Sequence, residues 1–176
     1  AATVPDSGPT LRWKGDWDSI FEEQQRPKIE ALLPAFLSTR RWFGGKARTQ
    51  RGMTIADTIP IRTAAGSAVL MLVQVEYLDA DGETYALPLA FATGAEAARI
   101  EAESPALIFA RTDGASEELR GILYDATGSA DFAKALLDAI IRRRSFGGEE
   151  SKIECSPTPP LKERDGQADS AHAHKP

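Results

Sequence analysis

Cysteine is almost absent from this chain of 176 residues, which contains only Cys155. A single thiol excludes an intramolecular disulfide and a zinc site built from several cysteines. Histidine is also scarce, with only His172 and His174, whose H-x-H spacing lacks a third ligand at a fixed position. We therefore predict no metal site. Because a serine or cysteine nucleophile needs a positioned base, the sequence also argues against Ser–His or Cys–His catalysis.

Excess positive charge and long apolar runs are missing as well. The formal net charge is −5, whereas nucleic-acid-binding surfaces are basic. No run approaches the roughly 18–20 apolar residues that span a bilayer, and no signal peptide opens the chain. The lack of disulfides agrees with a reducing compartment. We expect a cytoplasmic protein with no nucleic-acid or membrane partner.

The two ends of the chain differ in composition from the middle. Residues 1–10 (AATVPDSGPT) are small and interrupted by proline and glycine, which predicts a linker. Residues 161–176 have almost no apolar side chains to offset the entropy of ordering, which predicts a disordered tail. Residues 11–160 are then one domain. Because the chain begins with Ala1 rather than Met, we expect a piece of a longer polypeptide.

Helical spacing recurs in four segments. The first is a short helix at residues 17–21, and the third is an exposed helix over residues 94–103. The second has an apolar face that Pro34 should kink or restart: Ile29, Leu32, Leu33, Phe36 and Leu37. The fourth begins at Ser129 as N-cap, with residues 142–144 (RRR) in its last turn and Gly147-Gly148 at its end. Its predicted apolar face is Phe132, Leu136 and Ile140, widened by Ala133, Leu137 and Ile141.

Alternation of apolar and polar residues predicts strands. Residues 53–61, 68–78 and 83–91 are separated by turn residues and form a three-stranded antiparallel meander, with a lapse in the pattern at Asp57. Pro88 places the third strand at an edge or a bulge. Residues 106–111 and 119–125 are shorter strand candidates. The predicted fold class is α+β, an antiparallel sheet packed against helices.

The most unusual local feature is residues 40–51, RRWFGGKARTQR. Five cations occur there without an acid, in a chain that is otherwise acidic. One interpretation is a solvated turn at the end of a helix, with both aromatics buried under the sheet. The other is a docking surface, in which the cations face an acidic partner segment or a phosphate and the glycines let another backbone approach. Its residues are Arg40, Arg41, Trp42, Phe43, Gly44, Gly45, Lys46 and Arg48.

Other chemical interpretations are weaker. A phosphate-binding loop would read G-x-x-x-x-G-K-[ST] between a strand and a helix, whereas Lys46 is followed by Ala47 and preceded by a predicted helix. The carboxylates are numerous, but no pair lies in an apolar context that would raise a pKa for acid–base catalysis. Trp13, Trp17 and Trp42 could stack on sugars, although the last two have the spacing of residues packed against helices.

Residues 32–48, LLPAFLSTRRWFGGKAR, strongly resemble the opening of bacterial maltokinases. The pattern LP-x-FL-x-x-RRWFGGK-x-R is most like the form fused behind trehalose synthase. Further stretches are similar to the same family: residues 85–89 (YALPL), residues 121–126 (GILYDA), the helix at 129–144 and residues 156–158 (SPT). The resemblance covers roughly residues 13–160.

The resemblance implies a fold and a context. Maltokinases use ATP and Mg²⁺ to convert maltose to maltose 1-phosphate, which feeds α-glucan (glycogen) synthesis. A cap of helices on an antiparallel sheet precedes their catalytic core, which resembles aminoglycoside and eukaryotic-like kinases. We therefore expect this chain to be a non-catalytic N-terminal cap without a cofactor of its own. ATP and Mg²⁺ would belong to the parent kinase, and the expected partners are a kinase core in cis and a trehalose synthase domain.

The chain departs from the family after residue 158. Neither a segment like EQSNTS, which opens the kinase core, nor an H-x-D or H-G-D catalytic loop follows. No catalytic residue can be carried over, and the family's cap signature is confined to Arg41, Trp42, Phe43, Gly44, Gly45 and Lys46. Two alternatives stay open: a stand-alone protein–protein interaction module and a carbohydrate-binding module.

Overall fold

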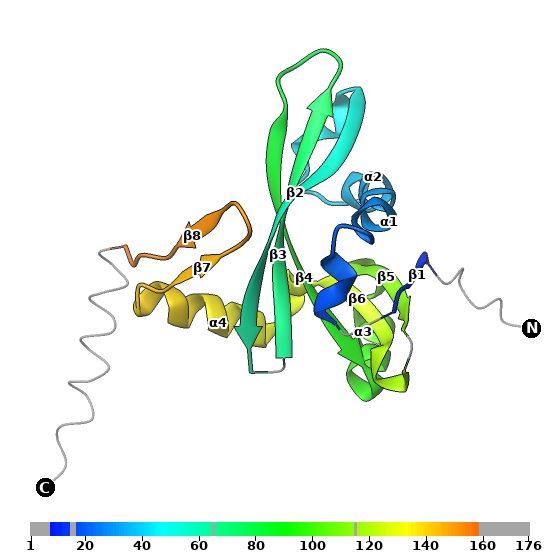
Figure 1. Cartoon of the computed structure of the whole chain (residues 1–176), viewed down its shortest axis with the longest axis vertical. Helices are drawn as coiled ribbons and strands as arrows, with labels where there is room; N and C mark the ends of the chain where they lie inside the picture. The colour runs from blue at the N-terminus through cyan, green and yellow to red at the C-terminus, as the bar shows by residue number, and fades with distance from the viewer. Residues whose placement is uncertain (1–7, 15–16, 65, 115, 159–176) are drawn as a thin grey trace, which may run out of the picture.

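The computed structural model describes residues 8–14, 17–64, 66–114 and 116–158. Its main sheet has six strands in the order β1-β5-β6-β4-β3-β2, and β7 and β8 form a separate hairpin (Figure 1). All neighbouring strands are antiparallel except β1 and β5, which are parallel. The strands are β1 (Thr10–Arg12), β2 (Gln50–Thr63), β3 (Gly66–Tyr77), β4 (Glu83–Thr93), β5 (Ile108–Asp113), β6 (Arg120–Asp125), β7 (Ser145–Gly147) and β8 (Lys152–Glu154).

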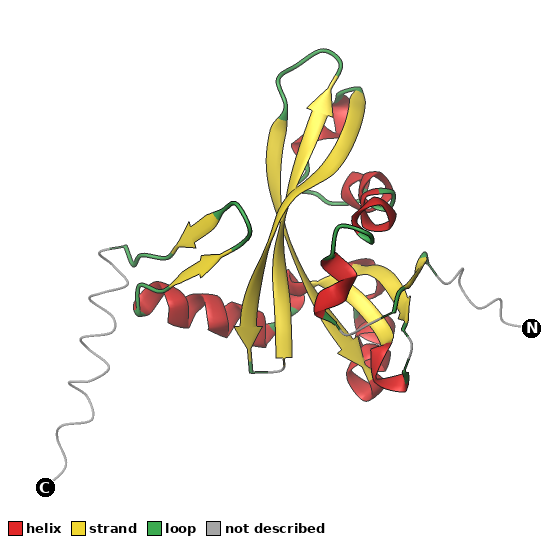
Figure 2. Cartoon of the chain, viewed as in Figure 1, coloured by secondary structure: helices red, strands yellow, loops and turns green. Residues whose placement is uncertain are grey.

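Helices cover both faces of this sheet (Figure 2). The α-helices are α1 (Arg26–Glu30), α2 (Leu33–Ser38), α3 (Gly94–Glu103) and α4 (Ala130–Ile141). Short 3-10 helices are η1 (Asp18–Phe21), η2 (Gly44–Ala47), η3 (Pro105–Leu107), η4 (Glu117–Leu119) and η5 (Ala126–Gly128). The predicted α+β class and the three-stranded meander, now β2-β3-β4, are confirmed. Of the predicted linker at 1–10, only residues 8–10 are described, and Thr10 begins β1; the predicted tail at 161–176 lies outside the described residues.

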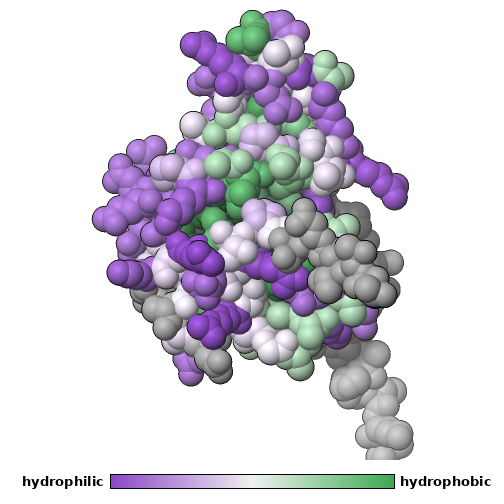
Figure 3. Space-filling model, turned by 90° about the vertical axis from the view of Figure 1, so that its right-hand side faces the viewer, coloured by the Kyte–Doolittle hydropathy of each residue, from purple (hydrophilic) through white to green (hydrophobic). Residues whose placement is uncertain are grey.

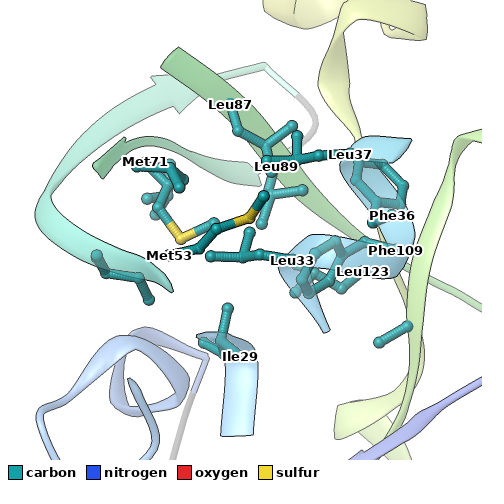
Figure 4. Packing of buried hydrophobic residues seen from close by; sticks show 14 of the residues in the cluster. Ile29, Leu33, Phe36, Leu37, Met53, Met71, Leu87, Leu89, Phe109 and Leu123 are labelled. Atoms are coloured by element: carbon teal, nitrogen blue, oxygen red, sulfur yellow. The ribbon is translucent and has the colours of Figure 1, made fainter. Parts of the chain in front are cut away.

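The larger hydrophobic cluster lies between α1, α2 and one face of the sheet (Figure 4). Pro34 occupies the first turn of α2, so the predicted helix restarts there rather than continuing. Ile29, Leu33 and Leu37 point from the two helices onto the strands and are fully buried. The opposite face of the sheet carries α3 and α4 over a second cluster that includes Ile100, Ile122 and Phe132.

A β-bulge explains the lapse at Asp57 in the predicted alternation. The register of β2 against β3 shifts between Ile55 and Asp57, so Ala56 is an extra residue. One inserted residue moves the following side chains to the other face of the sheet. Met53 and Ile55 therefore join the larger cluster, whereas Ile61 joins the second one.

Hydrogen bonds and a proline protect the sheet edge formed by β2 from pairing with another strand. The Ile55 N–H donates to Glu30 Oε1 of α1 at 2.7 Å, and the Thr58 N–H donates to Asp57 Oδ1 at 2.7 Å. Pro60 has no N–H to offer. These features occupy or remove donors that would otherwise be open to another chain's strand.

Pro88 lies where β4 still has one neighbour. Its partner on β3 is Leu70, and the pairing of β4 with β6 begins only at Leu89. The strand is therefore an edge at Pro88 and interior beyond it, which agrees with the predicted restriction on proline.

Helix α4 differs from its prediction in its apolar face, where Ala133 and Leu137 are exposed, and at its end, where residues 142–144 (RRR) follow the helix instead of forming its last turn. Ser129 is the N-cap as expected, and its Oγ accepts from the Phe132 N–H at 3.3 Å. Leu137, however, is 46% exposed, because it lies about 140° around the helix axis from Phe132 at 100° per residue. The helix ends at Ile141, and Arg143 takes a left-handed φ of 52°. The predicted termination at Gly147-Gly148 is therefore wrong, since these residues belong to the β7–β8 hairpin.

Replacing Gly121 by alanine is expected to lower the free energy of unfolding by about 1–3 kcal/mol through overpacking. Gly121 lies in β6 between β4 and β5, and an added Cβ would overlap the Ala92 carbonyl oxygen and lie 3.0 Å from its carbon. Backbone atoms of a central strand cannot move aside cheaply. Urea denaturation measures the loss, with Gly52→Ala as a control because nothing lies within 4 Å of its added Cβ. Equal stabilities of the two variants would contradict the expected overlap.

Candidate functional site

The segment at residues 40–48 forms a turn at one end of the sheet, hereafter the 40–48 turn. It leaves α2, passes through η2 and leads into β2, beside the loop that joins β3 to β4 (top of Figure 1). The Leu78 N–H of that loop donates to Thr49 O at 3.0 Å, and Gln50 pairs with Tyr77. The turn and the β3–β4 loop therefore make up one surface.

Phe43 anchors the turn to the domain. Its side chain is 2% exposed, and its ring packs edge-on against Tyr85 with centroids 4.9 Å apart. Gly45 is buried behind it, where an added Cβ would lie 2.7 Å from Phe43 Cζ and overlap the Tyr77 hydroxyl. Glycine is needed here for close approach of the backbone to an aromatic ring.

Trp42, by contrast, lies at the surface. It is 45% exposed, with its ring centroid 6.1 Å from that of Tyr85. The interpretation that buries both aromatics under the sheet is therefore right for Phe43 and wrong for Trp42. Arg41, Gly44 and Lys46 are also exposed. Leu78, 67% exposed, adds a second large apolar side chain to this end of the sheet.

Arg40 is held within the domain. Its guanidinium donates to the carbonyl oxygens of Ala106 and Phe36 and lies 4.0 Å above the Phe36 ring. The side chain is only 12% exposed, and Nη1 lies 3.9 Å from the Asp125 carboxylate. Arg40 also lines an apolar groove of about 540 Å³ between α2 and η3, on the face shown in Figure 3. Arg40 therefore stabilises the domain, whereas Arg41 is exposed.

A hydrogen-bonded cluster of Arg48, Tyr77, Glu83 and Tyr85 links the 40–48 turn to β3 and β4. Glu83 Oε2 accepts from the hydroxyls of Tyr85 and Tyr77, the latter at 3.0 Å, and Glu83 Oε1 accepts from Arg48 at 2.8 Å. The bonds from Tyr85 and Tyr77 hold the pKa of Glu83 below its ordinary value, with Arg48 adding to the effect and burial opposing it. Burial, followed by the bonds to Tyr85 and Glu83, raises the pKa of Tyr77.

The charge at this end of the sheet is mixed rather than basic. The sequence of the turn contains only cations, but β3, β4 and their loop bring four acids to the same end: Glu76, Asp79, Asp81 and Glu83. Arg48 is already paired with Glu83. Sequence reasoning missed this balance and also missed Leu78. The available signal was the D-A-D-G turn, which placed those acids at a hairpin end.

Replacing Glu83 by glutamine is expected to lower the Tm at neutral pH and to have less effect in acid. A carboxylate whose pKa is lowered by folding stabilises the protein above its unfolded pKa, about 4.3, and this stabilisation is lost as pH falls through the lower folded pKa. Thermal melts of both proteins from pH 7 to pH 3 test this. A Tm difference that stays constant over the whole range would contradict it. Glu76→Gln, at an exposed position of β3, is the control.

The remaining candidates lie elsewhere. Trp13 is buried, and the half-buried Trp17 stacks one face of its ring on Phe91 with centroids 4.8 Å apart. His172 and His174 lie outside the described residues. Among residues 8–14, 17–64, 66–114 and 116–158, no three acidic, histidine or cysteine side chains gather as a metal site. No helix in this part of the chain is long and apolar enough to cross a bilayer.

Comparison with protein families gives the context of this surface. Residues 36–128 match the model of the maltokinase N-terminal cap domain. The chain belongs to this family. The match contains the 40–48 turn and strands β2 to β6 and stops before α4 and the β7–β8 hairpin. No curated protein matches the chain. A maltokinase cap implies a kinase core in the same polypeptide, so the domain is expected to have a neighbour to contact.

Proposed function

We propose that this chain is the non-catalytic cap of a maltokinase and that the 40–48 turn contacts the kinase core of the same polypeptide. The core would bind ATP and Mg²⁺ and phosphorylate maltose to maltose 1-phosphate for glycogen synthesis. The RRWFGGK form of the turn further supports a parent in which trehalose synthase precedes the maltokinase. The cap would contribute contact surface and no reacting group.

The exposure of Trp42 is the observation that carries this proposal. Its neighbour Phe43 and the glycine at 45 fix the turn firmly on Tyr77 and Tyr85, so the backbone beneath Trp42 is well supported. A large aromatic ring held in place but left 45% exposed still has apolar area to bury. Tryptophan and arginine in such positions typically dominate the energy of protein interfaces.

The composition of the surface favours a protein over a phosphate as its partner. A phosphate site requires excess positive charge, but the turn shares its end of the sheet with the four acids of β3, β4 and their loop, and Arg48 is paired with Glu83. Apolar side chains surrounded by charges of both signs are typical of protein interfaces with an apolar centre and a polar rim. Figure 3 shows hydrophobic residues beside strongly hydrophilic ones at the upper end of the molecule.

The test compares Trp42→Ala with Leu137→Ala in the complete maltokinase polypeptide. The two side chains are 45% and 46% exposed, but Leu137 lies on α4, outside the proposed contact surface. We expect Trp42→Ala to cause a several-fold larger drop in the Tm of the complete protein than Leu137→Ala does, or a several-fold larger loss in its rate of maltose 1-phosphate formation. Equal effects of the two variants would contradict docking through this turn. Leu78→Ala should resemble Trp42→Ala in direction.

A further inference from the structure

Asp57 is a buried carboxylate in β2 that does not belong to the 40–48 turn. It is 1% exposed, and three successive backbone N–H groups of the β7–β8 turn donate to it. The N–H groups of Glu149, Glu150 and Ser151 lie 3.0, 3.1 and 2.7 Å from its oxygens. Burial by itself raises the pKa of Asp57, but these donors and Thr58 outweigh it and hold the pKa below its ordinary value. The carboxylate is therefore charged at neutral pH and fully hydrogen-bonded.

Little else holds the tip of the hairpin. Each of its strands has three residues, a length at which a two-stranded hairpin is marginal without further support. Glu149 also pairs with Arg26 at 2.9 Å, but its side chain is 74% exposed and such pairs contribute little. Phe146 packs partly against the second hydrophobic cluster. The remaining side chains of the strands are exposed, except for a half-buried Ile153.

The contact joins two parts of the chain that are far apart in sequence. Asp57 lies in β2, inside the family match at residues 36–128, and the hairpin lies after that match, 92 to 94 residues further on. The hairpin is the last described element before residue 158. The hydrogen bonds to Asp57 therefore tie the last described element to the part of the domain that matches the family.

We propose that Asp57 is a latch that fastens the β7–β8 hairpin to the edge of the sheet, and that the hairpin can detach as a unit while the remainder of the domain stays folded. The segment that detaches comprises residues 145–155, the two strands of the hairpin with their turn and Cys155. This device does not depend on docking through the 40–48 turn.

Two neighbouring glycines provide a matched pair of variants that leave Asp57 itself unchanged. An added Cβ at Gly148 would lie 2.7 Å from Asp57 Cγ and Oδ1 and closer still to Oδ2, so alanine must push the turn away from the carboxylate. An added Cβ at Gly147 meets nothing within 4 Å. Asp57→Asn is the complementary change, since its amide would present N–H groups to the backbone donors of the turn.

Hydrogen exchange of the complete 176-residue chain measures the release. We expect Gly148→Ala and Asp57→Asn to speed exchange of the amides at 145–155 at least tenfold, with less than a twofold change in β3 and β4, and Gly147→Ala to resemble the unmodified chain. Cys155, the only cysteine, should react faster with a maleimide in the same two variants. Unchanged exchange at 145–155 would overturn the latch and leave Phe146 as the anchor. Equal acceleration throughout the domain would overturn detachment as a unit.

Discussion

Replacing Phe43 by alanine is expected to lower the free energy of unfolding of the domain by about 3–5 kcal/mol, the usual cost of deleting a buried aromatic ring. Replacing Trp42, the residue before it, should cost less than about 1 kcal/mol, as at most surface positions. Phe43 is 2% exposed and belongs to the larger hydrophobic cluster, whereas Trp42 is 45% exposed. Two adjacent aromatics should therefore differ several-fold in their effect.

Urea denaturation of the 176-residue chain gives both values. The comparison is valid if both variants keep the same dependence of unfolding free energy on urea concentration, because a changed slope indicates a changed unfolded state. A loss of 3 kcal/mol or more for Trp42→Ala would contradict its assignment to the surface and would remove the main support for docking through the 40–48 turn.

The sequence could not separate these two residues, because a turn has no periodicity. Helices and strands reveal their buried faces through spacings of 3.6 and 2, which is why the apolar face of α1 and α2 and the meander β2-β3-β4 could be predicted. The segment of α3 was predicted to be an exposed helix, and this was wrong for Ala97 and Ile100, which are buried. In RRWFGGK the direction of each side chain is set instead by tertiary contacts: Tyr85 beside Phe43, and Tyr77 against Gly45. The composition indicated a site, and only the fold divides its residues into anchors and exposed groups.

The end of α4 and the role of Asp57 could not be predicted from the sequence either. The end of α4 depends on the left-handed conformation of Arg143, a residue type that seldom adopts it, so the glycines at 147 and 148 were the more plausible terminator. Asp57 interrupts an apolar pattern on β2, which could have been recognised as a buried acid. Three of its partners are backbone N–H groups more than 90 residues away, and backbone donors leave no trace in the residue types.

Arg40 and Arg41 make a second pair that the sequence cannot separate. Replacing Arg40 by alanine is expected to cost about 2–3 kcal/mol, the scale of buried hydrogen bonds to a charged group, together with lost packing on Phe36. Arg41 is exposed, and its replacement should change stability by no more than about 0.5 kcal/mol.

Arg40→Lys refines the comparison of the two arginines, because lysine keeps the charge but lacks the planar fork that reaches two carbonyl oxygens at once. We expect it to recover only part of the loss seen with alanine. In either variant Asp125 Oδ1 still accepts from the Thr127 N–H at 3.0 Å and the Thr127 hydroxyl at 2.7 Å, but Arg40→Ala also removes the guanidinium 3.9 Å from the buried Asp125 carboxylate, which Arg40→Lys replaces by another cation. The difference between the two variants therefore separates the charge of Arg40 from its hydrogen-bonding geometry. If urea denaturation finds Arg40→Ala as stable as Arg41→Ala, Arg40 does not anchor α2 to η3 and returns to the set of candidate docking residues.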